Sequence, residues 1–409
     1  MLNTSIAVRN LTRNRHRSLI ALITVAVGAI CLVLADGFVQ WIFWAMREGV
    51  IHSQLGHIQI VRPGYYGSGA ANPFMYLLPE NSPVLKAVES TQGVKLVAPR
   101  LTVTGLISHG ETTVSFLGDG VDPIKDKEAQ LSQALRIVEG RNLSGSSAQE
   151  VILGHGLARN LGVGVGAKVA LLATTSGGSI NGIEAKVAGL FVTPNQAYDD
   201  SALRLPIVLA QSLVRVRGAH AWIVLLQDTD QTNSFLEQFR SRFSGSGPDL
   251  EFIPWYARAD FYNKTVVLFS KQINVLRLII GFIIVLTISN ILIMNVLERT
   301  GEVGTLLAIG FRRSTILRMF ATEGLMLGLI GGLLGILAGY GLAELISTVG
   351  IPMPPPPGME EGITGRIQVS WVVVMNAFLI ALVTTLLAGL YPARRASRLQ
   401  IVDALRQNI

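Results

Sequence analysis

Residues 297–313 read Leu-Glu-Arg-Thr-Gly-Glu-Val-Gly-Thr-Leu-Leu-Ala-Ile-Gly-Phe-Arg-Arg, a short charged segment between two long apolar runs. The run before it covers 278–297 and the run after it covers 324–343. Each run has about the 20 residues that a helix needs to cross a bilayer, so the charged segment is expected in water at one membrane face. A small apolar stripe at helical spacing predicts a short helix that docks into the groove of a partner. The stripe consists of Thr305, Leu306, Ala308 and Ile309.

Hydrophobic residues make up 50% of the 409-residue chain and charged residues only 15%, a balance typical of membrane proteins. The apolar residues concentrate in four blocks, at 19–35, 278–297, 324–343 and 371–390. Basic residues precede the first block, as in a signal peptide, but no small-x-small cleavage site followed by polar sequence comes after it. Trp41, Phe43 and Trp44 follow instead, as in the interfacial aromatic belt of a retained helix. The sequence therefore predicts four transmembrane helices.

The net charge of +7 comes from basic residues that lie beside the apolar blocks. They cluster at 9–17, 299–318 and 394–406, whereas Arg366 is the only basic residue between Glu344 and Trp371. Basic clusters mark the cytoplasmic side of membrane helices, so both termini and the charged segment are expected in the cytoplasm. An even number of helices agrees with that placement. This distribution does not predict a nucleic-acid partner.

Between the first two apolar blocks, about residues 47–262 have the composition of a globular domain outside the membrane. Short β-like runs lie at 56–61, 101–108, 112–117, 151–153, 168–172, 186–191 and 221–226. Helical patterns interrupt them at 83–90, 127–135, 157–161 and 231–239. The predicted fold class is an α+β membrane protein with four transmembrane helices, N-in and C-in, and a large mixed α+β extracytoplasmic domain between helices 1 and 2. The single cysteine, Cys31, lies in the first apolar block, so the exported part is expected to fold without a disulfide.

The residue patterns of common enzymes are missing from this sequence. It contains no Gly-x-x-x-x-Gly-Lys-Ser/Thr loop, and the nearest stretch, 162–168, lacks both the spacing and the Ser/Thr. The six histidines form no His-Glu-x-x-His or cysteine-based metal pattern, and no Gly-x-Ser-x-Gly elbow is present. We therefore expect no catalytic residue, metal or cofactor in this chain, and expect ATP and magnesium on a separate ATPase subunit.

Three ordered segments near the C-terminal end closely resemble the FtsX-like, MacB-type permeases of ABC transporters. They are 298–310 (Glu-Arg-Thr-Gly-Glu-Val-Gly-Thr-Leu-Leu-Ala-Ile-Gly), Glu-Gly-Leu at 323–325 opening a Gly-rich helix, and a tail from Tyr-Pro-Ala-Arg-Arg at 391–395 to Val-Asp-Ala-Leu-Arg at 402–406. A looser resemblance to the extracytoplasmic core of the family reaches back through 151–158 and 161–169. The layout, about 400 residues without a fused ATPase, resembles most the lipoprotein-releasing LolC/LolE-type subunits.

The resemblance implies that residues 298–310 are a coupling helix in a groove of a cytoplasmic ATPase. Its ATPase-coupling residues would be Glu298, Arg299, Glu302, Thr305, Leu306, Ala308, Ile309 and Gly310. The implied partners are a cytoplasmic ABC ATPase dimer, a second permease copy or paralogue, membrane lipids, and a periplasmic lipoprotein carrier or adaptor. An aromatic candidate for contact with the periplasmic partner consists of Tyr65, Tyr66, Phe74 and Tyr76.

The resemblance also implies a function at the bacterial inner membrane. The expected protein is a permease subunit of an ATP-driven mechanotransmitting ABC transporter that extracts or transports lipoprotein or lipid from that membrane. Two alternatives stay open, a permease of a tripartite efflux pump and a transmembrane signalling subunit that regulates a cell-wall hydrolase.

Small residues in the third apolar block recur at four-residue spacing, which lets helices approach closely within one chain or across a dimer. They are Gly324, Gly328, Gly331, Gly332, Gly335 and Gly339. The expected order along the chain is a cytoplasmic interfacial segment at 1–17, transmembrane helix 1 at 18–46, a periplasmic MacB-like core domain at 47–262, a stalk with transmembrane helix 2 at 263–297, the coupling helix at 298–318, transmembrane helix 3 at 319–346, an outer Pro-rich loop at 347–369, transmembrane helix 4 at 370–391 and a cytoplasmic tail at 392–409.

Overall fold

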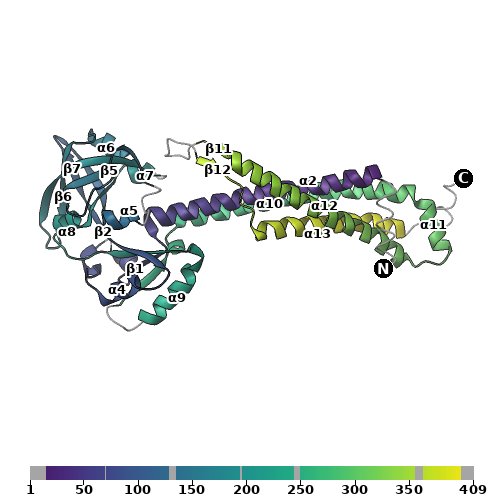
Figure 1. Ribbon diagram of the computed structural model, residues 1–409, viewed down its shortest axis with the longest axis horizontal. Helices are drawn as coiled ribbons and strands as arrows, with labels where there is room; N and C mark the ends of the chain where they lie inside the picture. The colour runs from purple at the N-terminus through teal and green to yellow at the C-terminus, as the bar shows by residue number, and fades with distance from the viewer. Residues whose placement is uncertain are drawn as a thin grey trace. The chain divides into compact units, whose positions relative to one another are not determined.

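The computed structural model describes residues 15–69, 71–128, 135–193, 196–243, 249–354 and 363–397 (Figure 1). The chain divides into two compact units. The helical unit draws its described residues from Met1–Trp44, Thr265–Met353 and Thr364–Ile409, and the sheet unit draws them from Ala45–Lys264 and Pro354–Ile363. Most of the expected interfacial segment, the proline run of the outer loop and most of the expected tail lie outside the described residues.

Among the described residues, four helices are long and apolar enough to cross a membrane. They are α2 (Arg15–Val50), α10 (Asp260–Glu298), α12 (Arg313–Val349) and α13 (Trp371–Ser397). The short helix α11 (Thr300–Ala308) connects α10 to α12, and strands β11 (Ile351–Met353) and β12 (Ile363–Gly365) pair with each other. Helix α10 continues past Lys264, Lys271 and Arg277 without a break, so the charged stretch before the second apolar block is helical.

The packing glycines of α12 divide into two sets that lie against different helices of the same chain. Gly324, Gly328 and Gly332 face α13, and Gly331, Gly335 and Gly339 face α2. A Cβ at Gly328 would lie 2.1 Å from Oγ1 of Thr385 on α13. A Cβ at Gly335 would lie 2.6 Å from the carbonyl oxygen of Ala26 on α2. Because real Cβ atoms do not approach neighbours so closely, both neighbours contact α12 at a distance that only glycine permits.

The described part of the sheet unit is built on one ten-stranded sheet (Figure 1). The strands follow the order β10-β1-β9-β2-β3-β8-β5-β7-β4, and β6 pairs with both β2 and β7. Their bounds are β1 Ile58–Val61, β2 Val94–His109, β3 Thr112–Val121, β4 Arg136–Gly140, β5 Glu150–Gly154, β6 Lys168–Thr174, β7 Ile180–Val192, β8 Ala202–Pro206, β9 Ala221–Leu226 and β10 Glu251–Pro254. The pairs β3–β8 and β5–β7 are parallel, and the other pairs in the described residues are antiparallel.

Strand β2 organises the sheet because its 16 residues pair with three other strands. Its first part pairs with β9, and its second part pairs with β3 on one edge and with β6 on the other. Gly105 makes the close passage of β6 possible, since a Cβ there would lie 2.1 Å from the carbonyl oxygen of Leu172. Val97, Leu101, Val103 and Ile107 of β2 are buried in the main core of the unit.

Short helices connect the strands and cover the sheet. They are the π-helical turn η1 (Ile51–Leu55), α3 (Tyr65–Ser68), η2 (Pro73–Tyr76), α4 (Pro83–Glu89), α5 (Pro123–Glu128), α6 (His155–Leu161), α7 (Gln196–Asp199), α8 (Ile207–Val214), η3 (Thr229–Gln231), α9 (Thr232–Phe243) and η4 (Trp255–Ala257). Trp222 of β9 and Phe239 of α9 are among the largest fully buried side chains, so the core lies between the sheet and these helices.

The end of α2 within the sheet unit is tied to η3 by a chain of hydrogen bonds. His57 accepts a hydrogen bond at Nδ1 from the backbone N–H of Leu226 (3.1 Å), so Nε2 carries the proton and donates to Oγ1 of Thr229 (3.0 Å). The Thr229 hydroxyl donates in turn to Oε1 of Glu48 (3.1 Å). Burial lowers the pKa of His57 to about 4, so this chain of bonds contains a neutral imidazole at pH 7.

The strands predicted from short β-like runs are confirmed, because they lie in β1, β2, β3, β5, β6, β7 and β9. Strands β4, β8 and β10, which have only four or five residues each, were missed, and in β8 the apolar run is interrupted by Arg204 and ended by Pro206. The predicted helices at 83–90, 157–161 and 231–239 correspond to α4, α6 and α9. Of the helix predicted at 127–135, the first two residues belong to α5, which ends at Glu128, and the prediction is wrong at Leu135, which forms a bend; 129–134 lie outside the described residues.

Candidate coupling surface

Two local signals separate α11 from the long helices on either side. The hydroxyl of Thr300 donates to the carbonyl oxygens of Leu297 (2.7 Å) and Val296 (3.2 Å), which occupies carbonyl groups at the end of α10. At the other end, Gly310 has a φ of 99°, a conformation that favours glycine, and α12 begins at Arg313. These signals define a short helix with a fixed start and end.

The inner side of α11 packs into an apolar cluster at the end of the helical unit. Val303 is 1% exposed, and Gly304 is also buried. The cluster consists of Val296, Val303, Ile316, Phe320, Ala393 and Ala396, with Leu306, Leu307, Leu317 and Met319 packed around it. These residues belong to α10, α11, α12 and α13, so α11 is anchored on the ends of three long helices.

Two ion pairs fasten the segment that leads into α11. Nη1 of Arg299 lies 3.8 Å from Oε2 of Glu323 on α12, and the two side chains are only 4% and 2% exposed. Glu298, the last residue of α10, pairs with Arg17 of α2 at 2.5 Å. Separating a buried pair leaves an uncompensated charge in apolar surroundings, so the Arg299–Glu323 pair resists movement of the bend between α10 and α11 relative to α12.

The opposite side of α11, together with the turn after it, is exposed and is called the outward face. It consists of Glu302, Thr305, Ala308, Ile309 and Phe311. Ile309 is 71% exposed and Phe311 is 44% exposed, and a carboxylate lies two turns before Ile309. Figure 1 shows α11 at one end of the long helices of the helical unit. A rigid short helix with two large apolar side chains and a flanking charge is suited to docking in a protein groove.

The structure places the predicted coupling residues in different environments. Glu302, Thr305, Ala308 and Ile309 lie on the outward face, with Gly310 exposed beside them. Arg299 is buried against Glu323 and does not reach the surface, and Leu306 is half-buried at the apolar cluster. Phe311 was missed by sequence reasoning. The sequence does indicate this residue, because Phe311 is a large apolar residue directly after Gly310, a glycine typical of a helix end.

The aromatic residues predicted as a partner contact gather in the sheet unit, but three of the four are half-buried. These three are Tyr65, Phe74 and Tyr76. Tyr65 stacks on His220 with 5.2 Å between ring centroids, and burial raises its pKa to about 12. The guanidinium of Arg258 lies 3.8 Å above the ring centre of Tyr66. In this segment Met75 is the more exposed residue, at 71%.

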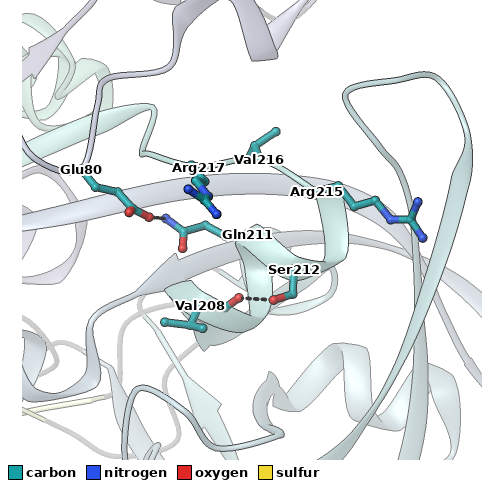
Figure 2. Close-up of a pocket in the computed structure, with 7 residues that line it drawn as sticks. All are labelled: Glu80, Val208, Gln211, Ser212, Arg215, Val216 and Arg217. Atoms are coloured by element: carbon teal, nitrogen blue, oxygen red, sulfur yellow. Dashed lines mark hydrogen bonds between the residues drawn. The ribbon is translucent and has the colours of Figure 1, made fainter.

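A surface depression of about 410 Å³ lies in the sheet unit (Figure 2). It is lined by Glu80, Val208, Gln211, Ser212, Arg215, Val216 and Arg217. Nε2 of Gln211 donates to Oε1 of Glu80 (2.7 Å), and the Ser212 hydroxyl donates to the carbonyl oxygen of Val208 (2.8 Å). Figure 2 shows the Arg215 side chain directed away from these groups. The polar groups bind one another, and among the described lining residues no nucleophile is paired with a base.

Within the described ranges, no group of three or more His, Cys, Asp or Glu side chains could hold a metal ion. The outward face of α11, with its two exposed large apolar side chains, is the candidate functional site.

Two known protein families match the chain. The MacB-like periplasmic core domain matches residues 18–242, which is more than half of the chain. The FtsX-like permease C-terminal domain matches residues 274–401, a range that includes α11.

Relatives match over most of the chain. An uncharacterized ABC transporter permease of Methanocaldococcus jannaschii is 22% identical over 98% of this chain and 96% of the archaeal one. The macrolide export ATP-binding/permease protein MacB of Rhodospirillum rubrum is 28% identical over 98% of this chain, which spans only 59% of that relative. The crystal structure of the periplasmic region of MacB from Actinobacillus actinomycetemcomitans is 14% identical over 53% of this chain and 95% of that chain, with a TM-score of 0.37.

Proposed function

This chain belongs to the family with a MacB-like periplasmic core domain and is an ABC transporter permease subunit of the MacB/FtsX type, and from that premise we propose that α11 couples it to a cytoplasmic ATPase. One observation carries the proposal. The outward face presents Ile309 and Phe311 to solvent, while the inner side of the same helix is fixed by the apolar cluster and by the Arg299–Glu323 pair. A push on the outward face would therefore move the ends of the long helices.

The proposed assembly divides the chemistry between subunits. The ATPase binds ATP and magnesium and hydrolyses the nucleotide, since this sequence contains no phosphate-binding loop. Two permease chains and two ATPase chains form the working complex. The protein lies in the bacterial inner membrane with both termini and α11 in the cytoplasm, and the sheet unit lies in the periplasm. Basic residues cluster at 9–17, 299–318 and 394–406, at the ends of the apolar helices assigned to the cytoplasm, and this asymmetry supports the orientation.

We favour a cargo that is lipidated or amphipathic, a lipoprotein or a lipid taken from the membrane. The support is the exposed side of α10, which carries large apolar residues where an acyl chain would lie. Leu278 is 73% exposed and Phe282 is 63% exposed. Export of a small molecule with a periplasmic adaptor and an outer-membrane duct is the second candidate, because a relative aligned over 98% of this chain is named a macrolide export protein.

The coupling proposal is tested by Ile309→Asp and Phe311→Asp in the full-length permease expressed with its ATPase. We expect each to lower ATPase co-purification by about tenfold or more, because an apolar anchor in a groove carries much of the binding energy. Ser314→Asp, an exposed position in the first turn of α12, places the same charge beside α11 and is the matched control. Co-purification at the control level in both variants would refute the proposal.

The cargo proposal is tested with photo-crosslinking amino acids at Leu278 and Phe282. The expected product is a lipoprotein or lipid adduct whose yield depends on nucleotide. A crosslinker at exposed Ser68 of the sheet unit is the control for unselective capture. Adducts formed only with a soluble, unlipidated compound would favour the export candidate instead.

A further inference from the structure

We infer that Asp36 and Arg277 lock α2 and α10 of one chain into a single two-helix body, so that a membrane cargo does not pass between these two helices. The statement about cargo rests on the proposed function. The statement about the two helices rests on contacts within the helical unit alone.

The pair is held by several hydrogen bonds from one guanidinium. Nη2 of Arg277 donates to Oδ2 of Asp36 at 2.7 Å, and Nε lies 3.2 Å from Oδ1 and 3.1 Å from Oδ2. Nη1 of Arg277 donates to Oδ1 of Asn274 at 3.0 Å, which orients the guanidinium from its own helix. The Asp36 side chain is 2% exposed. A fork of donors facing a buried carboxylate fixes both the distance and the rotation of the two helices.

The pair lies far from α11 along the helices. The rise of 1.5 Å per residue places Arg277 about 30 Å from Glu298 at the other end of α10. The hydrocarbon layer of a bilayer is about 30 Å thick, so the pair lies near the boundary opposite to α11 if α10 spans the membrane. Asp36 is buried among the helices rather than exposed at that boundary, and a buried carboxylate is costly unless it is paired, which explains why Asp36 and Arg277 meet.

Contacts between α2 and α10 continue in one antiparallel register along the helical unit. In order, they are Arg17 with Glu298, Gly28 with Ile284, Asp36 with Arg277, and Phe43 with Phe269. As the α2 residue rises from 17 to 43, its partner falls from 298 to 269, nearly residue for residue. A Cβ at Gly28 would lie 2.5 Å from Cδ1 of Ile284, so the helices are in close contact between the two ion pairs.

The Asp36–Arg277 ion pair fixes the register of α2 against α10, which apolar contacts alone do not fix. Apolar helices in lipid gain little from any one register, because lipid tails are as apolar as the side chains themselves. The charged pair permits only one register, and separating it would leave two uncompensated charges at the membrane boundary. The two helices therefore move together, and a cargo in the membrane has to use the exposed sides of α10 or α2 rather than the contact between them.

The first test measures the closeness of α2 and α10 without an ATPase or cargo. Phe43→Cys and Phe269→Cys, whose rings pack edge to face with centroids 6.4 Å apart, are combined with Cys31→Ser and oxidised in the full-length protein. We expect Asp36→Asn to slow disulfide formation by about tenfold. The exchanged pair, Asp36→Arg with Arg277→Asp, should restore the rate to within about twofold. An unchanged rate in Asp36→Asn, or a slow rate in a folded exchanged pair, would overturn the lock.

The second test asks whether the contact opens during function. The protein cross-linked between positions 43 and 269 is assayed with its ATPase, and the reduced protein is its matched control. We expect cross-linked and reduced proteins to have equal permease-dependent ATPase activity and cargo capture. Loss of both on cross-linking, with recovery on reduction, would overturn the inference while leaving the proposed function intact. No permease-dependent ATPase activity in either form would instead refute the proposed function, and the disulfide rates would still decide the lock.

Discussion

Several buried polar residues of this protein are held by partners from other parts of the sequence. Asp36 meets Arg277, and Glu323 meets Arg299, in each case across two helices. His57 connects Leu226 and Thr229 through the two nitrogens of one neutral ring. Burying such a group costs desolvation free energy, which its hydrogen bonds or ion pair offset. Its protonation and pairing therefore decide how the stability of the fold changes with pH.

Acid is expected to destabilise the sheet unit through its buried histidines. Burial lowers the pKa of both His57 and His220 to about 4, whereas an unfolded histidine titrates near 6.5. The unfolded chain therefore takes up protons between pH 6.5 and 4 that the folded protein does not, and stability falls as the pH decreases through that range. The loss is on the order of 3 kcal/mol per histidine near pH 4.

Thermal unfolding of the full-length protein in detergent, followed at several pH values from 7 to 4, measures this loss. His57→Gln with His220→Gln should flatten the dependence of the melting temperature on pH. His109→Gln removes an exposed histidine and is the control. Equal pH dependence in the double variant and the wild type would show that other groups cause the acid sensitivity.

At the residue scale, the outward face could be predicted only in part. Ile309 and Glu302 follow from helical periodicity, which is local information. The burial of Arg299 could not be predicted, because its partner Glu323 belongs to the next long helix and an arginine beside a glutamate in sequence usually indicates a solvated surface. Phe311 was missed because the helical pattern used to choose the coupling residues stops at Gly310, one residue before it.

At the scale of elements, the long apolar helices were predictable because lipid requires apolar residues over the length of a membrane span, and most strands were predictable because β-like runs end at turn residues. The five-residue strand β8 was not predicted, because Arg204 interrupts its short apolar run and Pro206 ends it. The glycine spacing of α12 indicated close packing but not the partner. Which helix each set faces depends on the rotation of α12 in the helical unit, and that rotation is set by tertiary contacts.

The close packing of α12 gives a test with an internal control. Gly335→Ala would place a Cβ 2.6 Å from both the carbonyl oxygen of Ala26 and the Cβ of Ala29. We expect a loss of roughly 1–3 kcal/mol in unfolding free energy, which is the usual cost of overpacking. Gly341→Ala lies on the same helix, where an added Cβ has no neighbour within 4 Å, and should be neutral or slightly stabilising.

Thermal or denaturant unfolding of the two variants in the same detergent compares these costs. A similar stability for Gly335→Ala and Gly341→Ala would mean that α2 and α12 do not approach each other as closely as the structure shows.

At the scale of the whole molecule, the orientation in the membrane gives the broadest prediction. In a Cys31→Ser background, Ser68→Cys and Ser179→Cys in the sheet unit should react with an impermeant maleimide in intact spheroplasts. Ser314→Cys, at the start of α12 beside α11, should react only after lysis. All three positions are exposed in the structure, so differences in labelling report the side of the membrane and not burial. The reverse labelling pattern would invert the proposed topology.

The glycine sets of α12 also limit the kind of movement that this helix can make. It presents bare backbone to α13 on one flank and to α2 on the other. Turning α12 about its axis by one residue, about 100°, would bring branched side chains into spaces that hold only hydrogen atoms. We therefore expect α12 to keep its rotation against α2 and α13 when α11 is displaced.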